Sequence, residues 1–309
     1  MIYALRHRTT YSYEERVSFA RCVLRLTPRH SATQTVLANS VTVVPRPSNT
    51  RDGTGPFGEK TRTVVIDTPH TALVIEAISR VDVHAPEPPD PKRGPSWETV
   101  REESFESRTL GPEGPAAYLY PTRRTPAASP ITEYARQSFA NGRSIVEGAA
   151  ELMTRIHKDF TYDPEATTVS TAALDAFTAR HGVCQDFAHV MISGLKGLGL
   201  PAAYVSGYLR TIPAPGKPRL EGADATHAWV SLWCGETHGW IGFDPTNALL
   251  VQNDHIVLAI GRDYSDVAPI DGIILAPGAQ TLKVEVDVIP QDETVAADHR
   301  PRARSSADR

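Results

Sequence analysis

The first ninety residues alternate apolar and polar positions in short runs, a pattern typical of β-strands. In "RVSFARCVLRLTP", Cys22 and Leu24 fall on one side of an extended chain, and Arg21 and Arg25 fall on the other. Turn residues separate three further β-branched runs, "TVLANSVTVVP", "TRTVVID" and "TALVIEAISRVDV". We therefore predict an antiparallel, sandwich-like β domain over residues 1–90.

The pattern changes after a proline-rich stretch. Five of the thirteen residues in "HAPEPPDPKRGPS" are proline, so we assign residues 91–130 to linker and loop. Apolar residues then recur at helical spacing and later in strand-like runs, which predicts an α+β core over residues 131–292. The polar segment 293–309 is predicted to be a disordered tail.

Several element boundaries carry local signals. "SWETVREES" and "SPITEYARQSFANG" predict short helices, and Ser144 and Glu147 have the spacing of a capping box. Gly182 is predicted to close the helix in "STAALDAFTARHG", and another helix is predicted to begin at Cys184. Strands are predicted in "PAAYVSGYL", "ATHAWVSLWC", "GWIGFD" and "LKVEVDVI".

Composition and charge indicate an ordinary globular protein. With 22% charged residues and a formal net charge of −4, the chain lacks the basic excess typical of nucleic-acid binding. The N-terminus shows no signal-peptide pattern and no apolar run could span a membrane, so we expect no membrane contact and a cytoplasmic location. Cys22, Cys184 and Cys234 form no CxxC pair, so neither a disulfide framework nor a metal or other cofactor is expected.

Cys184 is the candidate for chemistry, because it stands between a glycine turn and an apolar helix pattern. The N-terminus of a helix carries partial positive charge, which stabilises a thiolate. Alternatively, Cys184 could be a small buried residue without a chemical role. Cys22 and Cys234 alternate with their neighbours as core residues do, so we interpret both as buried core residues. A nucleophile also needs a base and a group that orients the base.

The predicted hairpin supplies both partners. If the loop runs from Gly235 to His238, Trp229 lies opposite Asp244, and His227 is the diagonal neighbour of Asp244 on the same face. Such diagonal pairs lie within reach of an imidazole and a carboxylate, but a register slip of one residue would separate them. Two other readings stay open: each residue could be structural, or a metal could bind Cys184, His189, His227 and Asp244.

These segments resemble the transglutaminase-like superfamily of papain-type cysteine enzymes. The resemblance rests on "GVCQDFAHVMISGLKGLGLPAAYVSGYL", "DATHAWVSLW" and "GWIGFDPTN", and it covers most of residues 1–290. "YALRHRTTYSYEERVSFARCVLRLTPR" resembles the N-terminal β domain of the bacterial members, and "HIVLAIGRDYSDVAPIDGI" resembles their segment after the aspartate. The family implies an α+β fold in which the nucleophile helix packs on an antiparallel sheet.

The resemblance also implies roles for individual residues. Cys184 matches the nucleophile, His227 the base and Asp244 the orienting carboxylate, while Tyr162 in "KDFTYDP" is the candidate donor to the oxyanion. Gln185 stands where animal transglutaminases often have tryptophan. The candidates for the substrate cleft are Gln185, Trp229, Arg262 and Asp266, although Arg262 and Asp266 could equally pair with each other for structure.

The implied reaction passes through a thioester formed from a peptide bond or a glutamine amide of a protein or peptide substrate. We expect hydrolysis rather than cross-linking, because water needs no second binding site. The alternatives are a protein-glutamine transamidase and a non-catalytic module that holds a peptide in the same cleft. A metallohydrolase and an assembly role for the β domain are further alternatives, and the oligomeric state is not indicated.

Overall fold

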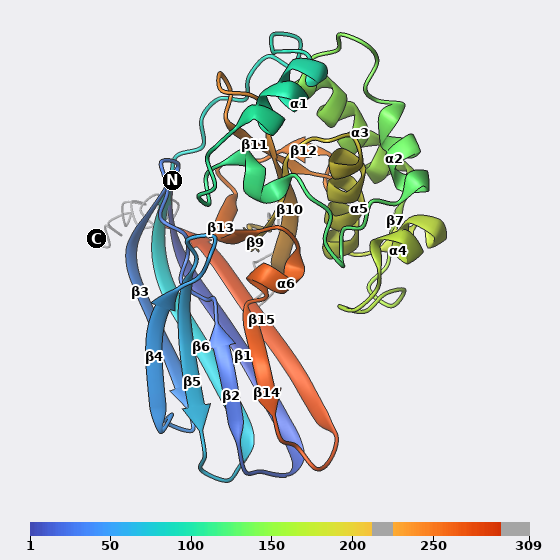
Figure 1. The fold of residues 1–309 in the computed structure, drawn as a ribbon. Coiled ribbons are helices and arrows are strands. Elements are labelled where there is room, and N and C mark those ends of the chain that lie inside the picture. The colour runs from blue at the N-terminus through green and yellow to red at the C-terminus, as the bar shows by residue number, and fades with distance from the viewer. Residues whose placement is uncertain (212–224, 292–309) are drawn as a thin grey trace, which may run out of the picture.

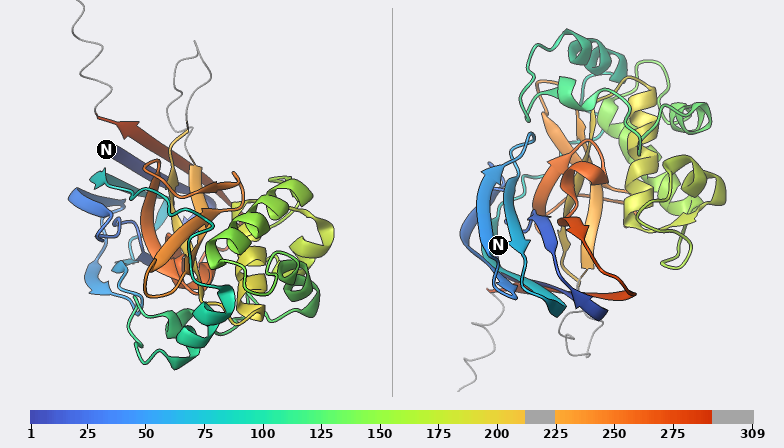
Figure 2. Two further views of the ribbon diagram at one scale, coloured as in Figure 1. Left: turned by 90° about the horizontal axis from the view of Figure 1, so that it is seen from above. Right: turned by 60° about the horizontal axis from the view of Figure 1, so that its bottom comes forward.

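The computed structural model describes residues 1–211 and 225–291 and has two parts, a β sandwich and an α+β core (Figure 1). The five-stranded sheet of the core lies between the sandwich and most of the helices (Figure 2). This architecture confirms the predicted fold class. The predicted disordered tail, residues 293–309, lies outside the described residues.

The sandwich consists of two four-stranded antiparallel sheets. The alternation seen in the sequence places Cys22 and Leu24 in the apolar layer between them, together with Leu73 and Ile75. One sheet has the order β15–β1–β6–β3, made of Gln280–Pro290, Ile2–Val17, His70–Val83 and Gln34–Val44. The other has the order β14–β2–β5–β4, made of Ile270–Ile274, Ala20–Leu24, Lys60–Ile66 and Asn49–Thr54.

Strands β14 and β15 join the sandwich although they come last in the described chain. β15 pairs with β1 from Tyr3 opposite Pro290 to Tyr13 opposite Gln280, and β14 pairs with β2. The predicted strand "LKVEVDVI" is therefore present as part of β15. The sequence analysis assigned it to a core over residues 131–292, whereas it pairs within the sandwich. The physical reason is backbone pairing, because β1 would otherwise leave a long row of unpaired N–H and C=O groups.

The core sheet has the order β12–β11–β10–β9–β13, and all its pairings are antiparallel. Helix α5 is buried along most of its length against this sheet, and α2 and α3 pack around it. The strands of the sheet are Leu249–Leu250, Trp240–Asp244, Ala225–Trp233, Ala202–Leu209 and His255–Gly261. The helices α1 to α6 are Trp97–Glu106, Ser129–Arg136, Ile145–Asp159, Ala173–Ala179, Cys184–Gly197 and Tyr264–Val267, and η1 is Pro115–Tyr118.

Some local expectations were wrong. The Ser144 side chain makes no cap bond to α3, and Glu147 instead pairs with Arg143 at 3.1 Å. Helix α4 ends at Ala179, before Gly182 is reached, and the residue that caps it is Arg180, in the left-handed region at φ 59°. Gly182 instead belongs to β8 (His181–Gly182), which pairs with β7 (Thr161–Tyr162). The short helix predicted in "SWETVREES" is present as α1, and it packs Trp97 into the core although residues 91–130 were assigned to linker and loop.

The sandwich and the core share an apolar contact. Tyr3 and Leu5 of β1, with Val286 and Val288 of β15, pack against Tyr208, Ile256 and Leu258 of the core sheet. Burying each such side chain contributes about 1.5–3 kcal/mol. The two parts are therefore held together firmly enough to position groups from one beside groups from the other.

Candidate active site

Cys184 is the first residue of α5, as the sequence predicts, and its side chain is half-buried. Asp186 shapes this helix start, because its Oδ2 accepts hydrogen bonds from the backbone N–H of Val183 at 2.9 Å and from Oγ1 of Thr167 at 2.7 Å. Gly182 leads into the turn at φ 158°, and a Cβ there would lie 2.6 Å from Oδ2 of Asp186. Only glycine fits this turn without strain.

The β10–β11 hairpin has the predicted register. Val230 lies opposite Phe243 and Trp233 opposite Trp240, and the backbone N–H of Cys234 donates to the carbonyl of Gly239 at 2.7 Å. In this register His227 and Asp244 meet on one face. Nε2 of His227 lies 2.8 Å from Oδ2 of Asp244, and both side chains are buried.

Asp244 accepts hydrogen bonds on both carboxylate oxygens. Oδ1 receives the backbone N–H groups of Thr246 and Asn247, at 2.9 and 3.2 Å. Oδ2 receives Nδ2 of Asn247 at 2.7 Å, in addition to the bond with His227. A carboxylate satisfied in this way is held in one orientation and stays ionised.

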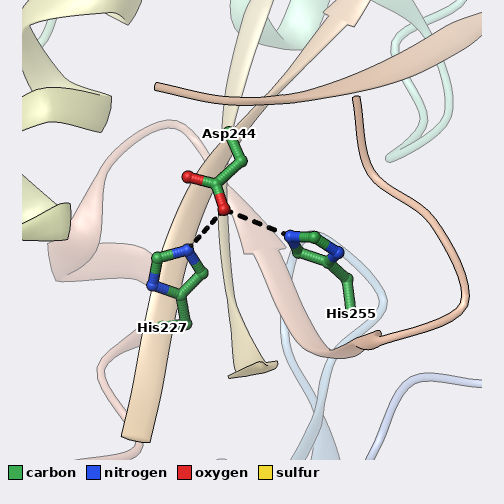
Figure 3. Close-up of side chains that lie close together, drawn as sticks. All are labelled: His227, Asp244 and His255. Carbon is green, nitrogen blue, oxygen red and sulfur yellow. Dashed lines mark hydrogen bonds and ion pairs between the residues drawn. The ribbon is translucent and has the colours of Figure 1, made fainter. Parts of the chain in front are cut away.

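His255 is a further partner of Asp244 that the sequence analysis missed. Its Nε2 lies 3.2 Å from Oδ2 of Asp244, so that the carboxylate stands between two imidazoles (Figure 3). Nδ1 of His255 is buried and has no hydrogen-bond partner among the described residues. The ring therefore carries its proton on Nε2 and donates it to Asp244. No local pattern connects these residues, because two strands, β10 and β9, lie between β11 and β13 in the sheet.

The charges of the pair follow from these contacts. Burial lowers the pKa of His227, but hydrogen bonds to Asp244 and Cys184 outweigh it and raise the pKa to about 10. Burial opposes ionisation of Asp244, but hydrogen bonds from His227 and His255 hold its pKa well below the usual range. Asp244 and Cys184 thus both favour the protonated form of His227.

The other two cysteines are in different surroundings. Cys22 and Cys234 are buried, as their alternation predicts. Burial raises the pKa of the Cys22 thiol to about 11 and raises that of Cys234 well above its ordinary value. Among the three cysteines, Cys184 combines a helix start, partial exposure and a histidine neighbour.

A cavity of about 250 Å³ opens in front of Cys184 and His227. Gln185 lines this cavity, and its Nε2 donates to the carbonyl of Val169 at 3.2 Å. Tyr162 is 54% exposed with its ring 6.5 Å from that of Phe187, and it does not line the cavity. Burial raises the pKa of Tyr162, and so does the negative charge that Cys184 can carry.

The remaining cleft candidates lie away from this cavity. Trp229 packs on His227 and His255 and lines a larger cavity, of about 510 Å³, that Cys184 does not line. Arg262 and Asp266 bond to each other through two N–H···O contacts of 2.9 and 3.0 Å, the arrangement expected of a structural pair.

The metal-ligand set considered from the sequence does not assemble. His189 instead accepts the backbone N–H of Tyr264 at 3.2 Å. In the part of the chain that the structure describes, the group compatible with a metal is His227, Asp244 and His255, whose ligand atoms lie within 4.8 Å of one another. In this group, Oδ2 of Asp244 already bonds to Nε2 of both histidines.

Comparison with known proteins identifies the family. Residues 3–82 match the bacterial transglutaminase-like N-terminal region, and residues 132–245 match the transglutaminase-like superfamily. A Mycobacterium tuberculosis protein described as uncharacterized is 41% identical over 298 residues, which cover 93% of this chain and 92% of that protein. The protein belongs to the transglutaminase-like superfamily. This membership confirms the resemblance drawn from the three sequence motifs.

Two other proteins are similar to this transglutaminase-like chain, one in its fold and one over part of its sequence. A structure from Cytophaga hutchinsonii, described as a candidate cysteine protease, has a TM-score of 0.72 at 21% identity and covers 94% of this chain and 92% of that chain, which shows a common fold. A protein-glutamine gamma-glutamyltransferase of Pseudomonas aeruginosa is 33% identical over 156 residues, 49% of this chain but 22% of that protein. Among the described residues, no helix is long and apolar enough to cross a membrane.

Proposed function

We propose that the protein is a cysteine-dependent enzyme that breaks peptide or glutamine amide bonds through a thioester. Cys184 is the nucleophile, His227 the acid and base, and Asp244 the group that orients His227. The observation that carries this proposal is the buried His227–Asp244 pair, joined at 2.8 Å beside a thiol at a helix start. The members of this constellation are the ones that acyl transfer through cysteine requires.

The reaction begins with the Cys184 thiolate and protonated His227. Sulfur forms a bond to the amide carbon, and the oxyanion is held by backbone N–H groups at the start of α5, with Tyr162 as a further donor. One such donor is worth about 10²–10³ in rate. The C–N bond then breaks, and the leaving amine takes a proton from Nδ1 of His227, the ring nitrogen that Asp244 does not contact. A thioester on Cys184 remains.

Water completes the cycle in the hydrolytic form of the reaction. His227, now neutral, takes a proton from water as its oxygen attacks the thioester carbon. The C–S bond breaks, and the acid product leaves with Cys184 again a thiolate and His227 again protonated. We favour hydrolysis because this route needs no second binding site, and we place the enzyme in the cytoplasm, where a free thiol stays reduced.

Transamidation is the second candidate. The similarity to the Pseudomonas aeruginosa glutamyltransferase, 33% identity over 156 residues, supports it. The two reactions share every step up to the thioester and differ in the acceptor. An assay that measures ammonia release and the incorporation of a primary amine into a glutamine peptide separates them.

The test of the proposed site is the alkylation rate of each cysteine against pH, measured by mass spectrometry with iodoacetamide. We expect Cys184 to react at mildly acidic pH because protonated His227 stabilises its thiolate, and we expect His227→Ala to abolish this reactivity. Cys22 and Cys234 serve as internal controls, since burial keeps their thiols protonated. Equal, slow labelling of all three cysteines below alkaline pH would contradict the proposal and favour a non-catalytic module that binds a peptide. In that case the Cys184→Ala variant should still bind the peptide.

A further inference from the structure

One face of the β15–β1 pair meets three different neighbours along its length. At one end, Tyr3 and Val288 pack against the core sheet. At the other end, Tyr13 packs into the sandwich. Between these contacts, the same face reaches the cavity in front of Cys184, so the β domain forms a wall of the proposed active site.

Strand β15 supplies the apolar part of this wall. Leu282 and Val284 line the cavity, and they are 58% and 44% exposed. They share a face with Val286, which is buried against the core, because side chains on a strand alternate between faces. Lys283 and Glu285 point to the other face and bond to each other at 2.9 Å. The apolar row that begins with buried Val286 therefore continues through Val284 and Leu282, which are exposed to water beside Cys184.

The opposite strand carries uncharged groups into the same cavity. Val284 lies opposite Thr9 and Leu282 opposite Tyr11, and both partners line the cavity. Ile270 of β14 lines it as well. None of the described lining residues is an aspartate, glutamate, lysine or arginine. The charges in the cavity are those of Cys184 and His227, which pair with each other in the proposed site. A charged substrate side chain beside Leu282 and Val284 would therefore lose its hydration without gaining a counter-charge.

We propose that Leu282 and Val284 form a subsite for an apolar side chain next to the reacting amide of the substrate. The inference rests on the proposed function and names its substrate class: peptides or proteins in which leucine, valine or phenylalanine flanks the glutamine or the scissile bond. Covering the two exposed side chains stabilises the complex, because apolar surface leaves water on both partners. The wall lies on a different domain from Cys184, which explains why the β domain accompanies the core.

The experiment compares two peptides that differ only in the residue flanking the reacting amide, leucine in one and aspartate in the other. For the wild-type protein we expect kcat/KM to be at least about tenfold higher for the leucine peptide. Leu282→Lys should remove this preference and improve turnover of the aspartate peptide. The matched control is Ile289→Lys, on the opposite face of the same strand and 39% exposed, which should keep the preference.

Two further measurements separate this proposal from the proposed function. Iodoacetamide labelling of Cys184 should be the same in Leu282→Lys and wild type, because the reagent needs no subsite. If neither peptide is turned over, the proposed function fails, and the affinities of the two peptides for Cys184→Ala protein, measured by fluorescence anisotropy, decide on the subsite alone. The proposed subsite would be overturned by equal turnover and equal affinity of the two peptides, or by a preference for the leucine peptide that survives Leu282→Lys.

Discussion

At the scale of single residues, Asp244 connects two histidines with different roles. In the proposed site the second nitrogen of His227 serves Cys184, whereas the second nitrogen of His255 is buried without a partner among the described residues. Because Nε2 is the ring nitrogen that contacts the carboxylate, His255 acts as a donor to Asp244. His255 is therefore a positioning residue in the proposed site.

Replacing His255 should slow the reaction without weakening substrate binding. We expect His255→Leu to lower kcat about tenfold, equivalent to ~1.4 kcal/mol in the transition state, with KM little changed. His255→Gln should restore most of kcat, because its amide N–H can take the place of Nε2. A KM effect as large as the kcat effect, or no rescue by Gln, would show that the residue only fills space.

The same variant makes a prediction about acid stability. The carboxyl of Asp244 has a pKa held below its usual range, so it stabilises the folded state above about pH 4, and this stability is lost as the pH falls. The loss of the His255 donor raises the folded-state pKa towards the unfolded value. Acid unfolding of His255→Leu, followed by circular dichroism, should therefore have its midpoint at a higher pH than wild type.

At the scale of elements, the start of α5 depends on its glycine turn. Gly182→Ala would place a methyl group 2.6 Å from Oδ2 of Asp186 and would strain the backbone at φ 158°. We expect a loss of about 1–3 kcal/mol in the free energy of unfolding, visible as a lower Tm, and slower alkylation of Cys184. Gly111→Ala is the matched control, since nothing lies within 4 Å of a Cβ there. Unchanged Tm and labelling in Gly182→Ala would rule out this role for the turn.

The elements also show which boundary signals were reliable. Glycine before a helix and the length of the β10–β11 loop were read correctly, because both depend on short-range backbone geometry. The capping box at Ser144 was not, because Arg143 attracts Glu147 and Glu151 into ion pairs. A local signal was overridden by a charged neighbour.

At the scale of the whole molecule, the β domain is part of the proposed active site. A chain that begins at Trp97 would leave β14 and β15 without partners and expose Ile256 and Leu258 to water. We expect this truncated protein to aggregate or to unfold without a cooperative thermal transition, and we expect residues 1–96, added as a separate chain, to restore both folding and Cys184 labelling. A truncated protein that unfolds cooperatively and keeps its activity would contradict this view.

The sequence by itself determined the short-range features of this protein. Periodicity placed the sandwich strands β2, β3, β5 and β6 and the helix that begins at Cys184. Turn length set the register that joins His227 to Asp244 at 2.8 Å. These features depend on residues close together in the chain. The tertiary structure decided the rest: the contact of His255 with Asp244 and the wall made by Leu282 and Val284. Both arise from strand order, because β13 and β15 pair with strands far away in the chain, and no local pattern encodes such pairings.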